Sequence, residues 1–150
     1  MKYIRILLFI VCVCVLQIAV LPRVWFLEVV PDLFLISAIL LAMKLPQAAQ
    51  RVSGALACGF LKDMFSSYLF GFNTVIFGVE SGIAYFVSRY LYKETKGVAF
   101  IVVASVTILN YIFLSAIFRK PYVFIGVEEA VLNCLFLPLV MKGVTLFLCA

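Results

Sequence analysis

The side chains that could do chemistry in this sequence are a few charged residues inside apolar segments. Asp63, Glu80 and Lys62 lie within such segments, and the chain contains no histidine. The absence of histidine excludes Cys-His and Ser-His-Asp catalytic sites and histidine-based metal centres. The five cysteines fall in apolar stretches without a C-x-x-C pair, so we interpret them as small hydrophobic residues. The sequence therefore predicts no enzyme, no metal site and no cofactor.

The composition is typical of an integral membrane protein. Hydrophobic residues make up 67% of the 150 residues and charged residues 13%, whereas an average soluble domain is about half apolar and about a quarter charged. A bilayer core of about 30 Å needs roughly 20 apolar residues per helix, so six helices would use about 120 residues. We expect one all-α membrane domain, residues 1–150, with no folded part outside the bilayer.

Charges, prolines and glycines divide the chain into six predicted membrane-spanning helices. Their approximate bounds are 6–21, 25–43, 52–69, 74–90, 98–118 and 122–145. The first follows a basic start, as a secretory signal would, but it lacks an A-x-A-like cleavage site. We therefore expect it to be retained as the first helix of a six-helix bundle.

The basic residues predict the orientation of this bundle, because cytoplasmic loops carry an excess of Lys and Arg. With the N-terminus in the cytoplasm, eight basic residues lie on the cytoplasmic side and three on the other: Lys2, Arg5, Lys44, Arg51, Arg89, Lys93, Lys96 and Lys142 against Arg23, Arg119 and Lys120. Both termini are then cytoplasmic, and the net charge of +5 reflects topology, so we expect no nucleic-acid partner. The alternative is five spans, with segment 25–43 re-entrant or broken at Pro31, but it disagrees with the charge rule.

Small and polar residues in the middle of the chain predict close helix packing, since helices in lipid associate through small residues and interhelical hydrogen bonds. Ala55, Gly59 and Asp63 follow at i, i+4 and i+8 on one face of a predicted helix. Gly78 and Gly82 have G-x-x-x-G spacing in the next. We expect these two helices to form an antiparallel hairpin, with the Asp63 helix near the bundle centre.

Asp63 allows a functional and a structural interpretation, because a carboxylate within a span costs several kcal/mol unless it is paired or protonated. It could bind a substrate, a proton or an ion, or it could pair with Lys62 or another helix, or cap a broken helix; we favour the structural role. Lys62 is expected to compensate an acid. Glu80 could pair with Lys62 or line a wet cavity, and both interpretations stay open. A polar cavity would involve Lys62, Glu80, Asn110 and Asn133.

Two segments resemble the rod shape-determining protein MreD family. They are VPDLFL at residues 30–35 and, after a basic loop, SGALACGFLKDMFSSYLFGFNTVIFGVESGIAYFVSRYL at residues 53–91. The matching features are Pro31, Asp32, Gly54, Gly59, Asp63, Gly71 and a span that ends in Arg89. Lys62 departs from the pattern, where an apolar residue is expected.

The resemblance implies a non-enzymatic scaffold subunit of the bacterial cell-elongation machinery in the inner membrane. It implies binding to an MreC-like bitopic membrane protein and, through it, to the MreB filament, a class B penicillin-binding protein and a SEDS-family glycosyltransferase. The family is also similar, in its six-helix arrangement, to the substrate-binding S component of energy-coupling-factor vitamin transporters. This alternative function would require a cavity open to the outside and lined by Asp63, Glu80, Asn110, Asn133 and aromatic residues.

Overall fold

The computed structural model describes residues 2–24, 29–66, 70–91, 96–119 and 122–149. All regular secondary structure in these ranges is helical: α1 (Lys2–Val15), the π-helical turn η1 (Leu16–Val20), α2 (Leu21–Val24), α3 (Leu33–Lys44), α4 (Ala48–Phe65), α5 (Phe72–Leu91), α6 (Lys96–Phe118) and α7 (Val123–Cys149). The predicted all-α class is confirmed. The predicted span boundaries at residues 25 and 69 lie outside the described residues.

Three helices of the described chain are long and apolar enough to cross a membrane. They are Tyr3–Arg23, which joins α1, η1 and α2 without a break, then Gly97–Phe118 and Val123–Phe147. They correspond to the first, fifth and sixth predicted spans. The chain is thus an all-helical membrane protein by the length and composition of its helices.

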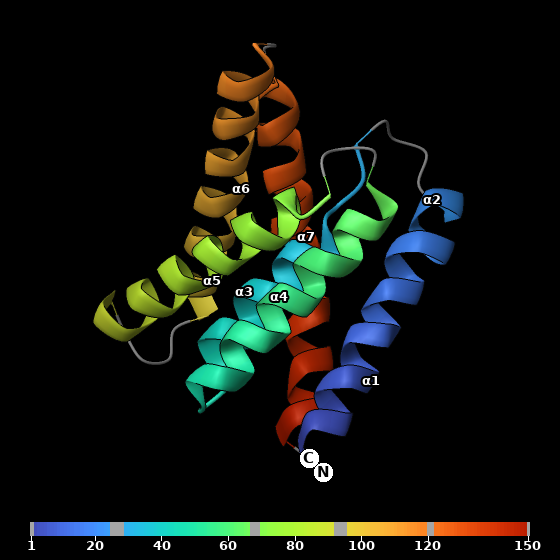
Figure 1. Ribbon diagram of the computed structural model, residues 1–150, viewed down its shortest axis with the longest axis vertical. Helices are drawn as coiled ribbons and strands as arrows, with labels where there is room; N and C mark the ends of the chain where they lie inside the picture. Colours follow the sequence, from blue (N-terminus) through green and yellow to red (C-terminus); the bar gives the residue numbers. More distant parts are fainter. Residues whose placement is uncertain (1, 25–28, 67–69, 92–95, 120–121, 150) are drawn as a thin grey trace.

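Successive helices run in alternating directions, and the N- and C-termini lie side by side at one end of the molecule (Figure 1). We call this the termini end, and the opposite end the far end. Helix α3 lies in the middle and packs against α1, α4, α5, α6 and α7. Helices α6 and α7 form a hairpin that rises toward the far end (Figure 1).

The segment before α3 is not helical, which corrects the predicted continuous span 25–43. Residues 29–32 form no helix, and α3 begins at Leu33, where Asp32 caps it by accepting a hydrogen bond from Leu35 N at 3.1 Å. Pro31 explains the late start, since proline disfavours helical geometry in the residue before it. The 12 residues of α3 extend for roughly 18 Å, less than the bilayer core of about 30 Å.

Helix α3 is also the most buried element, and α4, the helix that carries Asp63, packs directly against it. Every residue from Leu33 to Ala42 is buried. Helix α4 carries Asp63 but exposes Leu56, Phe60 and Met64 on its other side. The apolar character of α3 on all sides is what a helix surrounded by other helices requires.

Helices α4 and α5 form the expected antiparallel hairpin, and the close approach between them depends on Gly59. A Cβ atom on Gly59 would lie 2.7 Å from Thr74 Cα and 2.8 Å from Asn73 O. Both are backbone atoms, so any larger residue would force the helices apart. Gly71, in the turn before α5, has a φ of 91°, which glycine adopts without steric cost.

The other family-motif glycines differ in their surroundings. A Cβ on Gly54 would lie 3.1 Å from Leu41 Cδ1, and one on Gly78 would lie 3.3 Å from Leu56 Cδ2. Gly82 is exposed, and no described atom lies within 4 Å of the position its Cβ would take. Gly54, Gly59 and Gly78 therefore pack inside the chain, whereas Gly82 faces outward.

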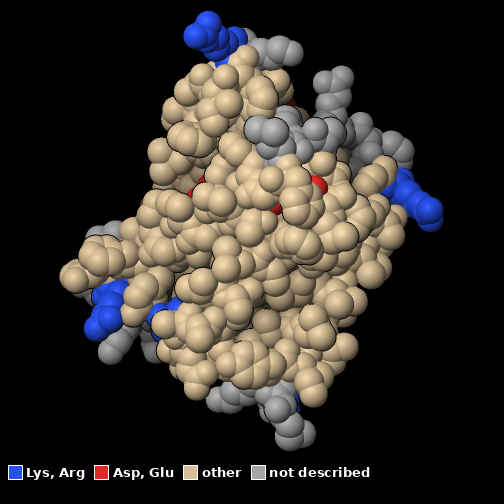
Figure 2. All heavy atoms as spheres, viewed as in Figure 1, with Lys and Arg blue, Asp and Glu red and all other residues tan. Residues whose placement is uncertain are grey.

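The surface matches a lipid environment. Figure 2 shows a face that is almost free of charged side chains, with Lys and Arg toward its margins and only small areas of acidic atoms visible between the other side chains. Large apolar side chains such as Leu7, Val79, Ile101 and Leu135 are exposed. Since lipid chains are as apolar as these residues, such an exterior is stable only within a membrane.

Candidate functional site

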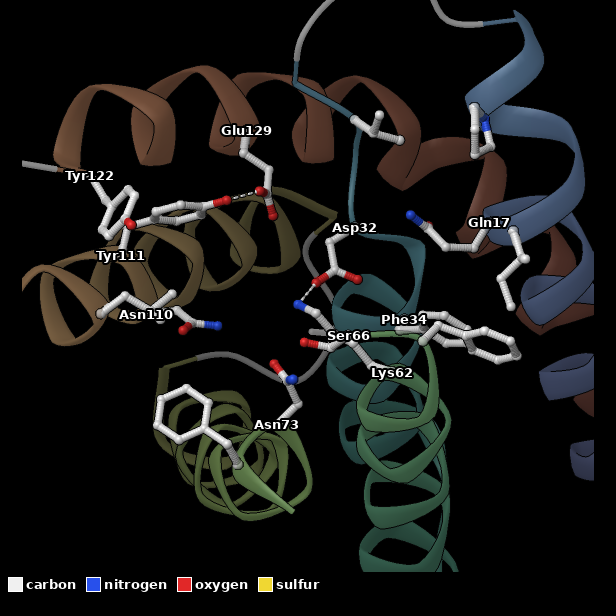
Figure 3. A pocket seen from close by; sticks show the side chains of 16 residues that line it. Gln17, Asp32, Phe34, Lys62, Ser66, Asn73, Asn110, Tyr111, Tyr122 and Glu129 are labelled. Atoms are coloured by element: carbon white, nitrogen blue, oxygen red, sulfur yellow. Dashed lines mark hydrogen bonds and ion pairs between the residues drawn. The ribbon is translucent and has the colours of Figure 1, made fainter. Parts of the chain in front are cut away.

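A cavity of about 420 Å³ opens near the far end of the bundle, where the helix ends converge (Figure 3). It is bounded by the last part of the first helix, the starts of α3, α5 and α7, the end of α4 and the second half of α6. Its lining residues are Gln17, Ile18, Pro22, Val30, Asp32, Phe34, Lys62, Phe65, Ser66, Phe72, Asn73, Asn110, Tyr111, Leu114, Tyr122 and Glu129. Polar groups from six separate segments thus surround one volume inside a membrane protein.

Lys62 and Asp32 form an ion pair at the wall of this cavity (Figure 3). The Lys62 side chain is 28% exposed and the Asp32 side chain 8%. The Lys62 ammonium also lies 5.1 Å from the centre of the Phe77 ring, a favourable cation–π arrangement. Lys62 departs from the family pattern, and the position of its ammonium on Asp32 gives this departure a structural role.

The non-helical backbone before α3 finds its hydrogen-bond partners in side chains around the cavity. Asp32 N donates to Asn133 Oδ1 at 2.7 Å, and Leu33 N donates to Gln17 Oε1 at 2.8 Å. Asn133 in turn donates to Thr107 Oγ1 at 3.1 Å. Unpaired backbone groups at membrane depth are costly, and irregular backbone occurs there only inside protein or beside a cavity. Gln17 and Asn133 therefore make the break before α3 stable.

Asp63 caps the start of α5 and is absent from the cavity lining. Its two carboxylate oxygens accept hydrogen bonds from Asn73 N and Asn73 Nδ2, both at 2.9 Å, from Thr74 N at 2.9 Å and from Thr74 Oγ1 at 2.6 Å. A carboxylate at a helix N-terminus also meets the positive end of the helix dipole. Among the structural roles that sequence analysis left open for Asp63, the geometry corresponds to capping, with α5 as the capped helix.

Two further acids, Glu80 and Glu129, are buried close enough to Lys62 to interact with it electrostatically. Glu129 lines the cavity and accepts a hydrogen bond from the Tyr111 hydroxyl. Glu80 does not line the cavity, and its Oε2 has no hydrogen-bond partner among the described residues. With Asp32, three buried carboxyl groups surround one lysine.

The structure brings together only part of the polar cavity that the sequence suggested. Lys62 and Asn110 line it, Asn133 is fully buried behind Asp32, and Glu80 lies outside the lining. Sequence analysis did not assign to this cavity the lining residues Asp32, Gln17, Tyr111 and Glu129.

Helical spacing contains the signal that would have identified Glu129. It lies four residues before Asn133 and therefore on the same face of α7, which continues through the buried residues Leu137, Val140 and Val144. Its neighbour Glu128 is exposed. The helix dipole favours Glu128 and Glu129 equally, but only Glu129 lies on the buried face of the helix.

The arrangement is suited to binding polar groups. Among the described residues, no group of three His, Cys, Asp or Glu side chains could hold a metal ion. Comparisons with protein-family models, characterised proteins and solved structures give no match to this chain. The fold and the site define an all-helical membrane protein with a polar cavity, and the resemblance to the MreD family rests on the residues quoted above.

Proposed function

We propose that the chain is a non-enzymatic scaffold subunit of the bacterial cell-elongation machinery, similar to the MreD family. It lies in the inner membrane, binds an MreC-like bitopic protein and is linked through it to the MreB filament and the peptidoglycan synthases. The observation that carries this proposal is that the residues behind the resemblance converge in the fold. Asp32, Gly59, Asp63 and Gly71 all act where α3, α4 and α5 begin, end or meet.

These residues have structural roles and supply no reacting group. Asp32 caps α3 and pairs with Lys62, Asp63 caps α5, and Gly59 allows the contact between α4 and α5. A sequence motif of this kind preserves the shape of a bundle. Residues with such structural roles support a protein that works by presenting surfaces to partners.

The basic residues support an orientation with both termini in the cytoplasm. Arg51 lies 4.1 Å from the centre of the Tyr85 ring, and Arg89 donates to Tyr85 Oη at 2.9 Å. Arg51 lies near the start of α4 and Arg89 near the end of α5, and both of these helix ends lie away from the cavity. Lys44, the last residue of α3, lies at the same end of the bundle. An excess of positive charge at this end is typical of the cytoplasmic side.

We assign the membrane helix of the bitopic partner to the outer face of α5 around Gly82. A glycine inside a helix costs about 1 kcal/mol relative to alanine, and no contact within the described chain accounts for Gly82. Val79 and Phe86 are exposed on the same side of α5. A glycine between larger apolar residues lets a second helix approach closely in lipid.

The test is co-purification of the full chain with an MreC-like bitopic protein from detergent-solubilised membranes. The wild type is expected to hold the partner, and Gly82→Leu to lose it without a loss of its own thermal stability. Ala116→Leu, which also enlarges an exposed small residue but on α6, is the control and should hold the partner. Depletion of the chain should round the cells; unchanged cell shape would defeat the proposal.

The cavity favours a second candidate function, the solute-binding component of an energy-coupling-factor transporter. Its volume of about 420 Å³ is within the range of small-molecule sites. Asp63 and Glu80, which this function was expected to place in the lining, lie outside it. Saturable vitamin binding that is weakened by Asn110→Ala, together with normal cell shape after depletion, would favour the carrier over the scaffold.

A further inference from the structure

We propose that the cavity binds a small molecule through a protonated amine, held by Glu129 and Asn110 beside the rings of Tyr111 and Tyr122. The inference does not depend on the scaffold function, because either a scaffold or a solute carrier could hold such a ligand.

The buried acidic side chains around Lys62 outnumber the basic ones among the described residues. Lys62 forms its ion pair with Asp32, while Glu129 receives its hydrogen bond from the neutral Tyr111 hydroxyl. Glu80 is a third buried carboxyl group in the same electrostatic environment. Buried carboxylates are stable only when cations or sufficient hydrogen bonds compensate them. A ligand with one positive charge would reduce the imbalance that Lys62 alone leaves.

Asn110 provides an independent observation that points to a hydrogen-bond donor. It is only 8% exposed, and its Oδ1 has no hydrogen-bond partner among the described residues. The side chain nevertheless lines the cavity, and Figure 3 shows its amide directed into that space. A buried acceptor without a partner is costly. An ammonium group carries three N–H donors and no acceptor, so it can satisfy Asn110 and Glu129 together.

The lining also contains aromatic rings that favour a cation. Tyr111 and Tyr122 lie next to Glu129 in Figure 3, and Phe34, Phe65 and Phe72 belong to the same lining. The faces of aromatic rings attract ammonium groups, most strongly where water is scarce. Because the cavity opens near the far end, the ligand would enter from the extracytoplasmic side in the proposed orientation.

The direct test is calorimetric titration of the purified full chain, in an uncharged maltoside detergent, with 2-phenylethylammonium and with its neutral counterpart 2-phenylethanol. The amine is expected to bind saturably and at least about tenfold more tightly than the alcohol, since charge-assisted hydrogen bonds are the stronger ones. Equal binding of the two compounds, or no saturable binding of the amine, would overturn the proposal.

Variants locate the binding to the cavity. Glu129→Gln should weaken amine binding by about tenfold, whereas Glu128→Gln, the exposed neighbour on the same helix, should leave it unchanged. Asn110→Ala provides a second variant that keeps all carboxyl groups, and it should also weaken binding. Unfolding curves verify that each variant is folded. Equal effects of Glu128→Gln and Glu129→Gln would contradict the assigned site.

Two sources could supply the amine, a free solute or the headgroup of phosphatidylethanolamine. The titration is therefore repeated in nanodiscs of phosphatidylglycerol alone and in nanodiscs that also contain phosphatidylethanolamine. If the headgroup occupies the cavity, it competes and weakens binding of 2-phenylethylammonium. Unchanged affinity in the two lipid mixtures assigns the site to a soluble amine, and both results retain the ammonium site.

Discussion

Lys62 near the end of α4 and Asp32 at the start of α3 form an ion pair that connects positions 30 residues apart in the chain. The same Asp32 caps α3 through Leu35 N, and its own N–H reaches Asn133 on α7. One aspartate thus connects three helices at the wall of the cavity. This connection gives the far end of the bundle a defined shape despite the short α3.

Breaking the ion pair on one side should destabilise the protein more than removing both charges. Lys62→Met leaves Asp32 buried without its cation, and we expect a loss of roughly 1–3 kcal/mol, because the lysine is partly exposed to the cavity. The double variant Lys62→Met/Asp32→Asn should recover part of this loss. Thermal unfolding in detergent measures both, with the exposed Lys44→Met as control. A double variant less stable than the sum of the two single changes would contradict the pairing.

Removing the Asp63 carboxylate should loosen the start of α5. Asp63→Ala deletes four hydrogen bonds to Asn73 and Thr74, and loss of a helix cap costs about 1–2 kcal/mol. Hydrogen exchange should become faster in the first turn of α5. The neighbouring exposed Met64→Ala should leave this exchange unchanged. Equal protection in wild type and Asp63→Ala would show that the carboxylate does not cap the helix.

Substitution by alanine should lower the stability of the chain at Gly59 and raise it at Gly82. Gly59→Ala places a Cβ 2.7 Å from the Thr74 backbone, so the hairpin must shift, at an expected cost of about 1–3 kcal/mol. Gly82→Ala has open space and should stabilise the isolated chain by about 0.5–1 kcal/mol through helix propensity. Midpoints of thermal unfolding compare the two. Stability losses of the same size at both positions would refute the described packing.

Asn133 should matter more for stability than its partner Thr107. Asn133→Leu leaves Asp32 N without an acceptor inside the bundle, and we expect a loss of about 1–3 kcal/mol. Thr107→Val removes a hydroxyl that accepts from Asn133 and donates to Val103 O at 2.8 Å, a carbonyl that the helix already satisfies. Chemical unfolding of both variants tests the order, and a larger loss for Thr107→Val would reverse it.

Labelling of single cysteines should place the two sides of the bundle in different compartments. Gln47 precedes α4 at the termini end, and Phe124 in α7 lies at the far end; both are exposed. In a background without the native cysteines, a membrane-impermeant maleimide added to intact cells should label Phe124→Cys and spare Gln47→Cys. Labelling of both, or of neither until the cells are opened, would contradict the proposed topology.

Local sequence patterns correctly predicted part of this structure. Uninterrupted apolar runs predicted the first and fifth spans, and the sixth was predicted despite its acids and lysine. Helical spacing placed Ala55, Gly59 and Asp63 on one buried face, as observed. A break at Pro31 was stated as the alternative to a continuous span 25–43, and the charge rule outweighed it; the structure has the helix start at Leu33. Local capping of α5 by Asp63 was one of the foreseeable alternatives.

The sequence pattern alone did not predict which distant segments contact one another. Sequence analysis named Asp63 and Glu80 as partners for Lys62, and the fold pairs it with a third acid, Asp32. The cavity itself arises because five helix ends leave a space between them, and no local pattern encodes such a space. Gln17 reaches it from a π-helical turn, a feature that apolar periodicity does not predict.

The central claim is that this bundle holds a bitopic partner through its membrane helices. Quantitative co-purification with an MreC-like protein, compared between wild type, Gly82→Leu and Ala116→Leu at equal expression, tests it most directly. The account predicts a stable complex for wild type and Ala116→Leu and its loss for Gly82→Leu. Absence of any complex with the wild type, while the purified chain still binds a small solute, would contradict the scaffold function.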